Sequence, residues 1–130
     1  MTKHNQRVGA WGEETATVWL ASRGYEVIRR NVRTPYGEID IVVQKNGVTV
    51  FVEVKTLTAS KSFFPESQIT ARKREHMLNA AMHHAAEQGI DHWQIDVIAI
   101  EGKAGETPDI HHFENIQSQR SLQSLWDIII

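Results

Sequence analysis

The segment that decides the fold is Gly37–Lys55, GEIDIVVQKNGVTVFVEVK. Two runs rich in β-branched residues, 38–44 and 48–55, flank the dipeptide Asn46-Gly47. Asn-Gly is the strongest short signal for a two-residue hairpin turn, because both central positions of a type I′ turn need a positive φ. The segment therefore predicts an antiparallel hairpin.

A two-residue turn also fixes which residues face each other. Counting outward from it sets Asp40 opposite Glu53 and Glu38 opposite Lys55, and opposed residues share a sheet face. One face then carries only aliphatic side chains: Ile39, Ile41, Val43, Val50, Val52 and Val54. The other carries Glu38, Asp40, Val42, Gln44, Thr49, Phe51, Glu53 and Lys55. A slip of one residue would mix the two sets, so the pattern supports this register.

Opposed carboxylates at Asp40 and Glu53 repel each other unless a cation compensates. Mg²⁺ prefers carboxylate oxygens and often uses only one or two of them, together with water and phosphate. Lys55 points to the same side and could hold a phosphate oxygen or orient a metal-bound water. This layout suits metal-assisted phosphodiester hydrolysis. The alternative is a solvated strand face with a Glu38–Lys55 cross-strand ion pair.

The rest of the chain predicts a mixed α/β sheet flanked by helices. The expected elements are a helix over 8–23, a strand over 25–31, the hairpin, a helix over 70–88 and a strand over 93–100. The order is α-β-β-β-α-β, and residues 110–116 are also compatible with an edge strand. The second helix should bury the stripe Leu78, Ala81, Met82 and Ala85. The strand–helix–strand unit favours parallel pairing of residues 48–55 with 93–100.

Composition indicates an ordinary globular protein of one domain. The 130 residues are 41% hydrophobic and 23% charged, and cysteine is absent, which excludes disulfides and thiolate chemistry. No apolar run approaches the roughly 20 residues of a membrane helix, so we expect a cytoplasmic protein without a membrane partner. We expect residues 1–116 to form the domain and residues 117–130 to form an apolar tail for docking or oligomerisation.

The net charge of −2 hides an uneven distribution. Residues 1–75 hold 12 Lys and Arg against 8 Asp and Glu, whereas residues 76–130 hold 2 against 8. The basic part contains Arg30, Arg33, Arg72 and Lys73, which we take as candidate nucleic-acid contacts. Each of them has an ordinary alternative as a solvated surface cation. A nucleic-acid partner is therefore compatible with the overall acidity.

The motifs GEIDIV at Gly37–Val42 and FVEVK at Phe51–Lys55 resemble the PD-(D/E)xK nuclease superfamily. The closest resemblance is to the YraN-like family of uncharacterised proteins regarded as endonucleases, relatives of archaeal Holliday-junction resolvases. Matching pieces also include Gly9-x-x-Gly12-Glu13-x-x-Ala16, Trp19-Leu20, Gly24-Tyr25, Asn31-x-Arg33, Ile69-Thr70-x-x-Lys73 and Asp96-Val97. The resemblance covers roughly residues 7–116.

The resemblance implies a restriction-endonuclease-like core and Mg²⁺- or Mn²⁺-dependent cleavage of DNA, with branched or structured DNA as a candidate substrate. It implies Asp40, Glu53 and the Val54 carbonyl as metal ligands. It also implies Lys55 as the catalytic lysine and Glu13 as an auxiliary acid near the metal. A homodimer is expected by the same resemblance, and no small-molecule cofactor is expected.

Two departures from the family pattern concern phosphate or structural contacts. Leu57 stands where the family usually has Arg, and Gln94 stands near Asp96 where Arg is common. Asp96 lies in the middle of an apolar strand, so it needs a hydrogen bond or an ion pair. We expect it to have a structural role or to support a metal ligand, with direct ligation as the alternative. We expect structural or exposed roles for all seven histidines. The alternative function is a non-catalytic nucleic-acid-binding or adaptor protein on a nuclease-like scaffold.

Overall fold

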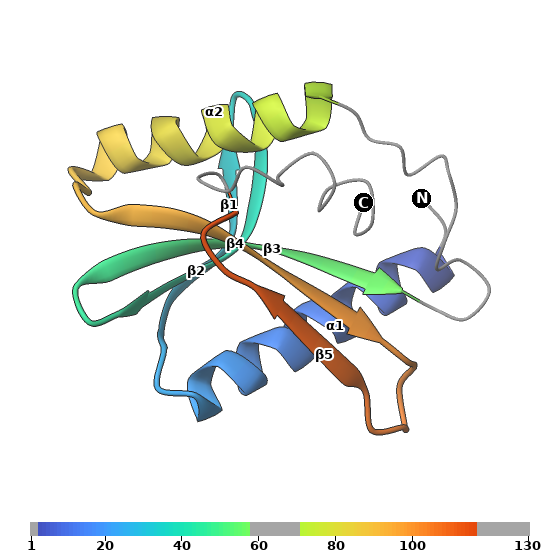
Figure 1. The fold of residues 1–130 in the computed structure, drawn as a ribbon. Helices are drawn as coiled ribbons and strands as arrows, with labels where there is room; N and C mark the ends of the chain where they lie inside the picture. Colours follow the sequence, from blue (N-terminus) through green and yellow to red (C-terminus); the bar gives the residue numbers. More distant parts are fainter. Residues whose placement is uncertain (1–2, 58–70, 117–130) are drawn as a thin grey trace.

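The structure is a computed structural model that describes residues 3–57 and 71–116, with side chains for 7–57 and 75–116 (Figure 1). Its elements are α1 (Lys3–Ser22), β1 (Glu26–Thr34), β2 (Gly37–Lys45), β3 (Val48–Leu57), α2 (Ala71–Gln88), β4 (Trp93–Glu101) and β5 (Asp109–Phe113). The predicted α/β class is confirmed. The edge strand that residues 110–116 allow is present as β5, in addition to the expected order.

The predicted hairpin is confirmed, and so is its register near the turn. β2 pairs antiparallel with β3 from Lys45↔Val48 to Ile41↔Val52. Asn46 and Gly47 have φ values of 53° and 79°, the positive pair that the turn requires. The register thus follows from two residues whose backbones tolerate this conformation.

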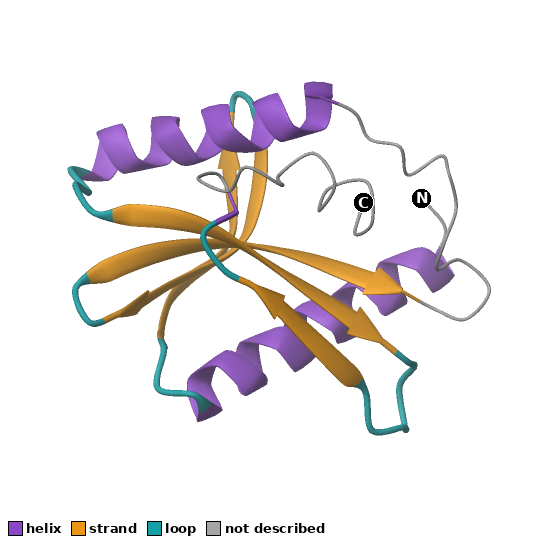
Figure 2. Cartoon of the chain, in the orientation of Figure 1, coloured by secondary structure: helices purple, strands orange, loops and turns teal. Residues whose placement is uncertain are grey.

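A five-stranded sheet in the order β1-β2-β3-β4-β5 forms the middle layer, and the two helices cover its opposite faces (Figures 1 and 2). β3 and β4 are parallel neighbours, as expected for the crossover through α2. β4 is almost wholly buried, which explains its nearly continuous apolar sequence. β5 pairs antiparallel with β4 and forms one edge.

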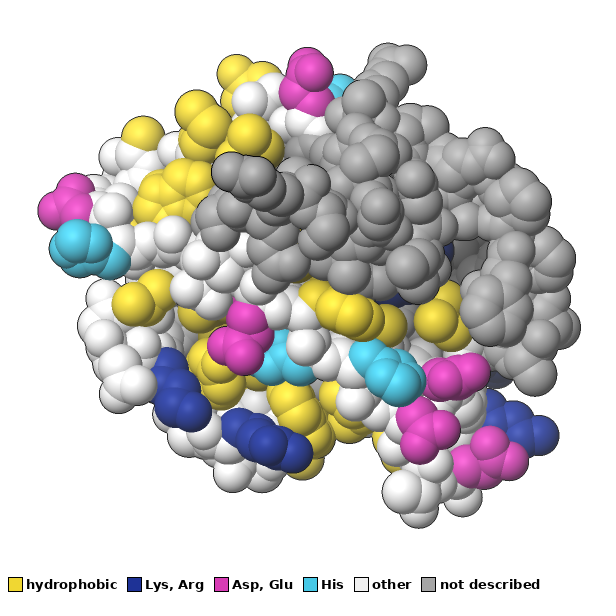
Figure 3. All heavy atoms as spheres, in the orientation of Figure 1, with side chains coloured by type: hydrophobic (Ala, Val, Ile, Leu, Met, Phe, Trp, Pro, Cys, Tyr) yellow, Lys and Arg dark blue, Asp and Glu magenta, His cyan; other side chains and the backbone are white. Residues whose placement is uncertain are grey.

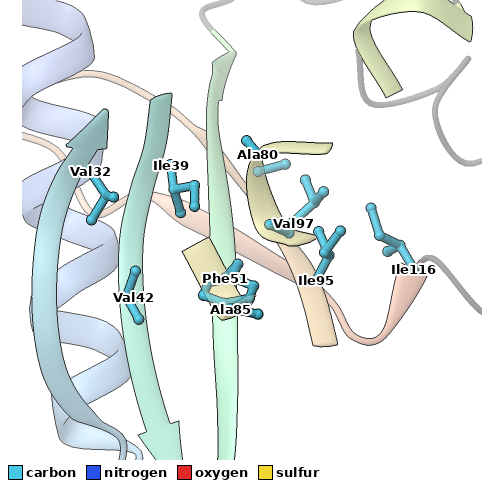
Figure 4. Close-up of a cluster of buried hydrophobic side chains, with 11 residues drawn as sticks. Val32, Ile39, Val42, Phe51, Ala80, Ala85, Ile95, Val97 and Ile116 are labelled. Atoms are coloured by element: carbon cyan, nitrogen blue, oxygen red, sulfur yellow. The ribbon is translucent and has the colours of Figure 1, made fainter. Parts of the chain in front are cut away.

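Each face of the sheet carries its own core layer. The α1-side core contains Ala16, Leu20, Ile41, Val43, Val50, Val52, Ile98 and Ile100. The α2-side core contains Val32, Ile39, Val42, Phe51, Ala80, Ala81, Ala85, Ile95, Val97, Ala99 and Ile116 (Figure 4). Successive residues of β4 pack alternately in the two core layers, because successive side chains of a strand point to opposite faces of the sheet.

The predicted stripe of α2 is wrong at two of its four positions. Ala81 and Ala85 are buried, but Leu78 and Met82 are 37% and 50% exposed. The helix instead buries Ala80 and His84 beside the two predicted alanines. The buried face is thus rotated around the helix axis, and three alanines bring the helix close to the sheet.

The predicted face of Ile39 is also wrong. Ile39 belongs to the α2-side core, whereas Ile41 belongs to the α1-side core. β1 changes in the same way next to these residues. Val32, the partner of Ile39, belongs to the α2-side core, whereas Arg30, the partner of Ile41, contacts Glu14 of α1. Asn31 lies between the two residues of β1 at a φ of 53°. The alternation of a regular strand is therefore broken at this level.

Several expectations lie outside the described residues. These include the apolar tail 117–130 and the division of the chain at residue 116.

Neither α1 nor α2 combines the length and apolarity needed to cross a bilayer.

Candidate functional site

Asp40 lies where β2 separates from β3. The last printed pair of these strands is Ile41↔Val52, so Asp40 and Glu53 are not partners in the ladder, contrary to expectation. Glu38 likewise pairs with Arg33 of β1 and not with Lys55. The Asp40 carboxylate reaches across instead, and its Oδ2 accepts a hydrogen bond from the Val54 amide at 2.8 Å. The Asp40 side chain therefore takes the place of a backbone acceptor of β2 for the Val54 amide.

Three candidate residues follow one another along β3. Phe51 and Leu57 pack in or against the α2-side core, so by alternation Glu53 and Lys55 face that side too. Both are half-buried. The Val54 carbonyl points to the same strand edge as the Val54 amide, because both groups of an extended residue lie on one side. That edge is the one that Asp40 approaches.

The electrostatics of Asp40 show how closely the acids converge. Burial, followed by the Glu53 carboxylate, raises the pKa of Asp40 to about 8, against the Val54 hydrogen bond, which lowers it. The carboxylates of Glu13 and Glu38 also raise this pKa. A buried carboxyl among three acids holds its proton unless a cation takes the place of that proton.

Glu13 comes to this site from the helix layer. It is half-buried on α1, and burial raises its pKa, while the Arg30 guanidinium lowers it and Glu38 raises it. Its neighbour Gly12 lets the helix approach β3 closely. A Cβ on Gly12 would overlap with Thr56 Oγ1 and would lie 3.7 Å from Val54 Cγ1. The absence of a side chain at residue 12 therefore helps to place Glu13.

We predict that Gly12→Ala makes the protein less stable than Gly9→Ala by about 1–3 kcal/mol. Both glycines lie on α1, but a Cβ on Gly9 meets nothing within 4 Å. Gly9→Ala should therefore show the helix-propensity gain alone, up to about 1 kcal/mol. Urea unfolding of the two variants measures the difference.

Thr56→Ala provides the check on this prediction, because it removes the oxygen that the new methyl group would meet. The double variant Gly12→Ala/Thr56→Ala should recover part of the lost stability beyond the sum of the single effects. Equal stability of the Gly9→Ala and Gly12→Ala variants would contradict a close approach of α1 to β3.

The four candidate phosphate contacts fall into two groups. Arg30 forms an ion pair with Glu14 of α1 at 2.9 Å, and Arg33 lies 3.6 Å from Glu38 with 89% of its side chain exposed. Both flank the acids described above. Arg72 and Lys73 occupy the first turn of α2, and their side chains lie outside the described residues.

A second group of titratable side chains joins β4 to β5. Asp96, His112 and Glu114 each offer one ligand atom, and these atoms lie within 4.8 Å of one another. The group could hold a metal ion. Asp96 is fully buried and accepts a hydrogen bond from Gln94 Nε2 at 2.9 Å.

The prediction that His112 is an exposed or structural histidine does not include this group. A buried acid at residue 96 needs a partner, and the register of β5 against β4 decides which histidine contacts it. His112 pairs with Ile98, two residues from Asp96, whereas His111 pairs with Ala99. The alternation of the half-buried Ile110 and His112 with the exposed His111 is the sequence signal that indicates which histidine faces Asp96.

The family model described as "Uncharacterised protein family UPF0102" matches residues 12–100. A UPF0102 protein of Syntrophotalea carbinolica is 36% identical over 115 residues, covering 87% of this chain and 93% of the relative. One from Treponema pallidum is 37% identical over 125 residues, covering 89% and 99%. One from Roseiflexus castenholzii is 39% identical over 116 residues, covering 86% and 94%. The matched span includes Glu13, Asp40, Glu53 and Lys55.

Proposed function

This chain belongs to the uncharacterised protein family UPF0102, and from that premise we propose that it is a metal-dependent endonuclease that hydrolyses phosphodiester bonds in DNA. Branched or structured DNA is the candidate substrate. The proposal places it in the cytoplasm, where it meets DNA directly. The resemblance of GEIDIV and FVEVK to nuclease motifs supports this reading.

One observation carries the proposal: the convergence of acids at the point where β2 leaves β3. The Asp40 carboxylate lies against the Val54 amide at 2.8 Å, and its pKa is raised by burial and by Glu53. A solvated strand face would leave such carboxyls exposed and would not raise their pKa. The excess negative charge fits a hard divalent cation, because every donor offered is an oxygen.

Asp40, Glu53 and the Val54 carbonyl would hold Mg²⁺ or Mn²⁺. The bound ion supplies an activated water and stabilises the charge that develops on phosphorus. Lys55, two residues beyond Glu53 on the same side of β3, orients the attacking water or holds a phosphate oxygen. Glu13 adds a carboxylate from α1 that can accept a proton near the reacting phosphate, since its pKa is raised by burial.

The basic side chains around the acids would contact the DNA backbone. Arg33 is the most accessible of those described, whereas Arg30 would have to exchange its ion pair with Glu14 for a phosphate. Arg72 and Lys73 are placed at the start of α2, where a phosphate would also meet the positive end of the helix dipole. A homodimer would double this small footprint on a branched substrate.

A cleavage assay with chelator-treated protein tests the function. Four-way junctions, single strands and linear duplexes are incubated with no metal, Mg²⁺, Mn²⁺ or Ca²⁺. We expect cleavage only with Mg²⁺ or Mn²⁺, and fastest on branched DNA. The same series with RNA checks the choice of nucleic acid.

The alternative function predicts a different result in the same experiment. A non-catalytic nucleic-acid-binding or adaptor protein would bind the substrates without metal-dependent turnover. In gel shifts, its binding would be unchanged by Asp40→Asn. Binding of this kind with no product under any metal condition would contradict the nuclease proposal.

A further inference from the structure

Asp96 is a buried acid whose two oxygens are held by groups from β4 and from the end of β5. It is 0% exposed in the middle of β4. Its Oδ1 accepts hydrogen bonds from the Asn115 amide and Gln94 Nε2, each at 2.9 Å. Its Oδ2 lies 2.7 Å from His112 Nε2. Burying a carboxylate costs several kcal/mol unless its oxygens find such partners, and here every partner comes from β4 or from the β5 region.

Glu114 brings a second carboxylate to the same place. The ligand atoms of Asp96, His112 and Glu114 lie within 4.8 Å of one another, although Glu114 itself is exposed. Asn115 follows at a φ of 53°, an uncommon value that turns the chain so that its amide reaches Asp96. The chain thus bends back immediately after β5, and two acids and an imidazole gather at one edge.

The surroundings of His112 fix the position of the imidazole. The rings of Trp19 and Tyr25 lie edge-on to it, with centroids 5.4 and 6.2 Å away. Both aromatic residues pack against the α1-side core. Figure 3 shows histidine and acidic side chains next to apolar ones on the face presented by β5. An imidazole held by an apolar shell beside two carboxylates is typical of transition-metal sites.

We propose that Asp96, His112 and Glu114 form a binding site for a transition-metal cation, with Zn²⁺ as the preferred ion. One imidazole nitrogen and two carboxylate oxygens form a three-ligand set that suits Zn²⁺, which binds through such donors at about 2.0–2.2 Å and leaves a fourth position to water. Mg²⁺ fits less well because it prefers oxygen donors. The bound ion ties the edge strand β5 to β4.

This site is separate from the acids proposed for catalysis. Asp96 pairs with Val52 of β3, so β3 lies between β4 and the Asp40 side of the sheet. By alternation Asp96 faces the α1 side together with Ile98, whereas Glu53 and Lys55 face the α2 side. Glu13 also lies on the α1 side, but the charges that act on it and on Asp40 are those of the acids around Asp40 and of Arg30, and Asp96 is not among them. The zinc proposal therefore does not depend on nuclease activity.

Titration of the chelator-treated full chain with Zn²⁺ by calorimetry, with metal analysis after dialysis, tests the proposal. We expect one Zn²⁺ per chain and a rise in Tm on the order of 10 °C at 100-fold excess over Kd. Glu114→Gln should weaken binding by at least about 10-fold, and His112→Gln should abolish it. Asp109→Asn, which removes an exposed acid from the other end of β5, should change nothing.

Asp40→Asn provides the control that separates the two sites. Zn²⁺ binding should survive in this variant with the same stoichiometry. Binding that disappears with Asp40→Asn, or that persists in both His112→Gln and Glu114→Gln, would overturn the proposal. So would the absence of stoichiometric Zn²⁺ binding in the wild type, which would leave Asp96 and His112 as a hydrogen-bonded anchor for β5. Because Glu114 is exposed, its variant keeps the test valid if His112→Gln fails to fold.

Discussion

Asp40→Asn should lower metal-dependent DNA cleavage by a factor on the order of 10²–10³, the range observed when one group that stabilises developing charge is removed. The amide oxygen of Asn can still accept the hydrogen bond that Val54 donates to Asp40 at 2.8 Å. The local backbone is therefore kept while the negative charge is lost. Initial rates over a range of Mg²⁺ concentrations measure the effect, and excess metal should restore little of it.

Lys55→Ala should cause a loss of similar size by a different route. Lys55 would act on the water or phosphate and not on the metal, so its variant should keep the Mg²⁺ dependence while the maximal rate falls. Lys55→Arg should recover part of the rate if only charge is needed. Lys103→Ala and Glu26→Gln are matched controls, because both change exposed charges of the same chain. Cleavage that is unchanged in Asp40→Asn and Lys55→Ala would exclude the proposed mechanism.

The hairpin shows why much of the sheet can be predicted from sequence. Asn46-Gly47 fixes the register locally, and the aliphatic alternation on both sides admits no other. The apolar run at β4 likewise predicts a strand covered on both faces, which its burial confirms. These are elements in which local propensity and burial agree.

The errors occur where tertiary contacts override the local pattern. Ile39 changes sides because β1 and β2 alter their course together around Asn31, and a single strand pattern carries no information about its neighbour. Leu78 and Met82 looked like core residues at helical spacing, but the sheet accepts the smaller alanines of α2. Such choices depend on how closely two layers can approach.

The candidate site was predictable in part for the same reason. The face of Glu53 and Lys55 on β3 could be found by alternation, whereas the position of Asp40, beyond the last ladder pair of the hairpin, could not. The pairing of Asp96 with His112 depends on the register of β5 against β4, for which the alternation of Ile110 and His112 is a weaker signal than a two-residue turn. A site assembled from one hairpin is therefore easier to find in the sequence than a site assembled from two separately placed strands.

The raised pKa of Asp40 predicts an unusual dependence of stability on pH. The folded protein holds this proton with a pKa of about 8, whereas the ordinary value is 3.8. The folded state therefore binds more protons than the unfolded state between these values, and the free energy of unfolding falls as the pH rises from about 4 to about 8. The contribution of Asp40 is fully present below 3.8 and is lost above 8.

Asp40→Asn should remove this dependence and stabilise the metal-free protein at pH 8 by about 2–5 kcal/mol. The gain arises because Asn avoids the burial of a charge, which is the largest cause of the raised pKa of Asp40, and because it carries no charge among Glu53, Glu13 and Glu38, which also raise this pKa. At pH 4 the two proteins should differ little. Urea unfolding in the presence of a chelator, repeated at half-unit steps from pH 4 to pH 9, measures both curves, with Glu26→Gln as the control.

Mg²⁺ should reverse the order of the two proteins, which links the stability result to the proposed function. A divalent ion binds the ionised form of Asp40, so it should raise the Tm of the wild type at pH 8 and raise it less at pH 5, where the proton competes for the same oxygens. The variant should not respond, since it has lost the charge that attracts the ion. If Asp40→Asn is no more stable than the wild type at pH 8 without metal, the acids do not converge around Asp40 in solution. If the variant is more stable but Mg²⁺ leaves the Tm of the wild type unchanged, the buried carboxyl of Asp40 does not bind a divalent cation. That result would contradict the proposed metal-dependent mechanism.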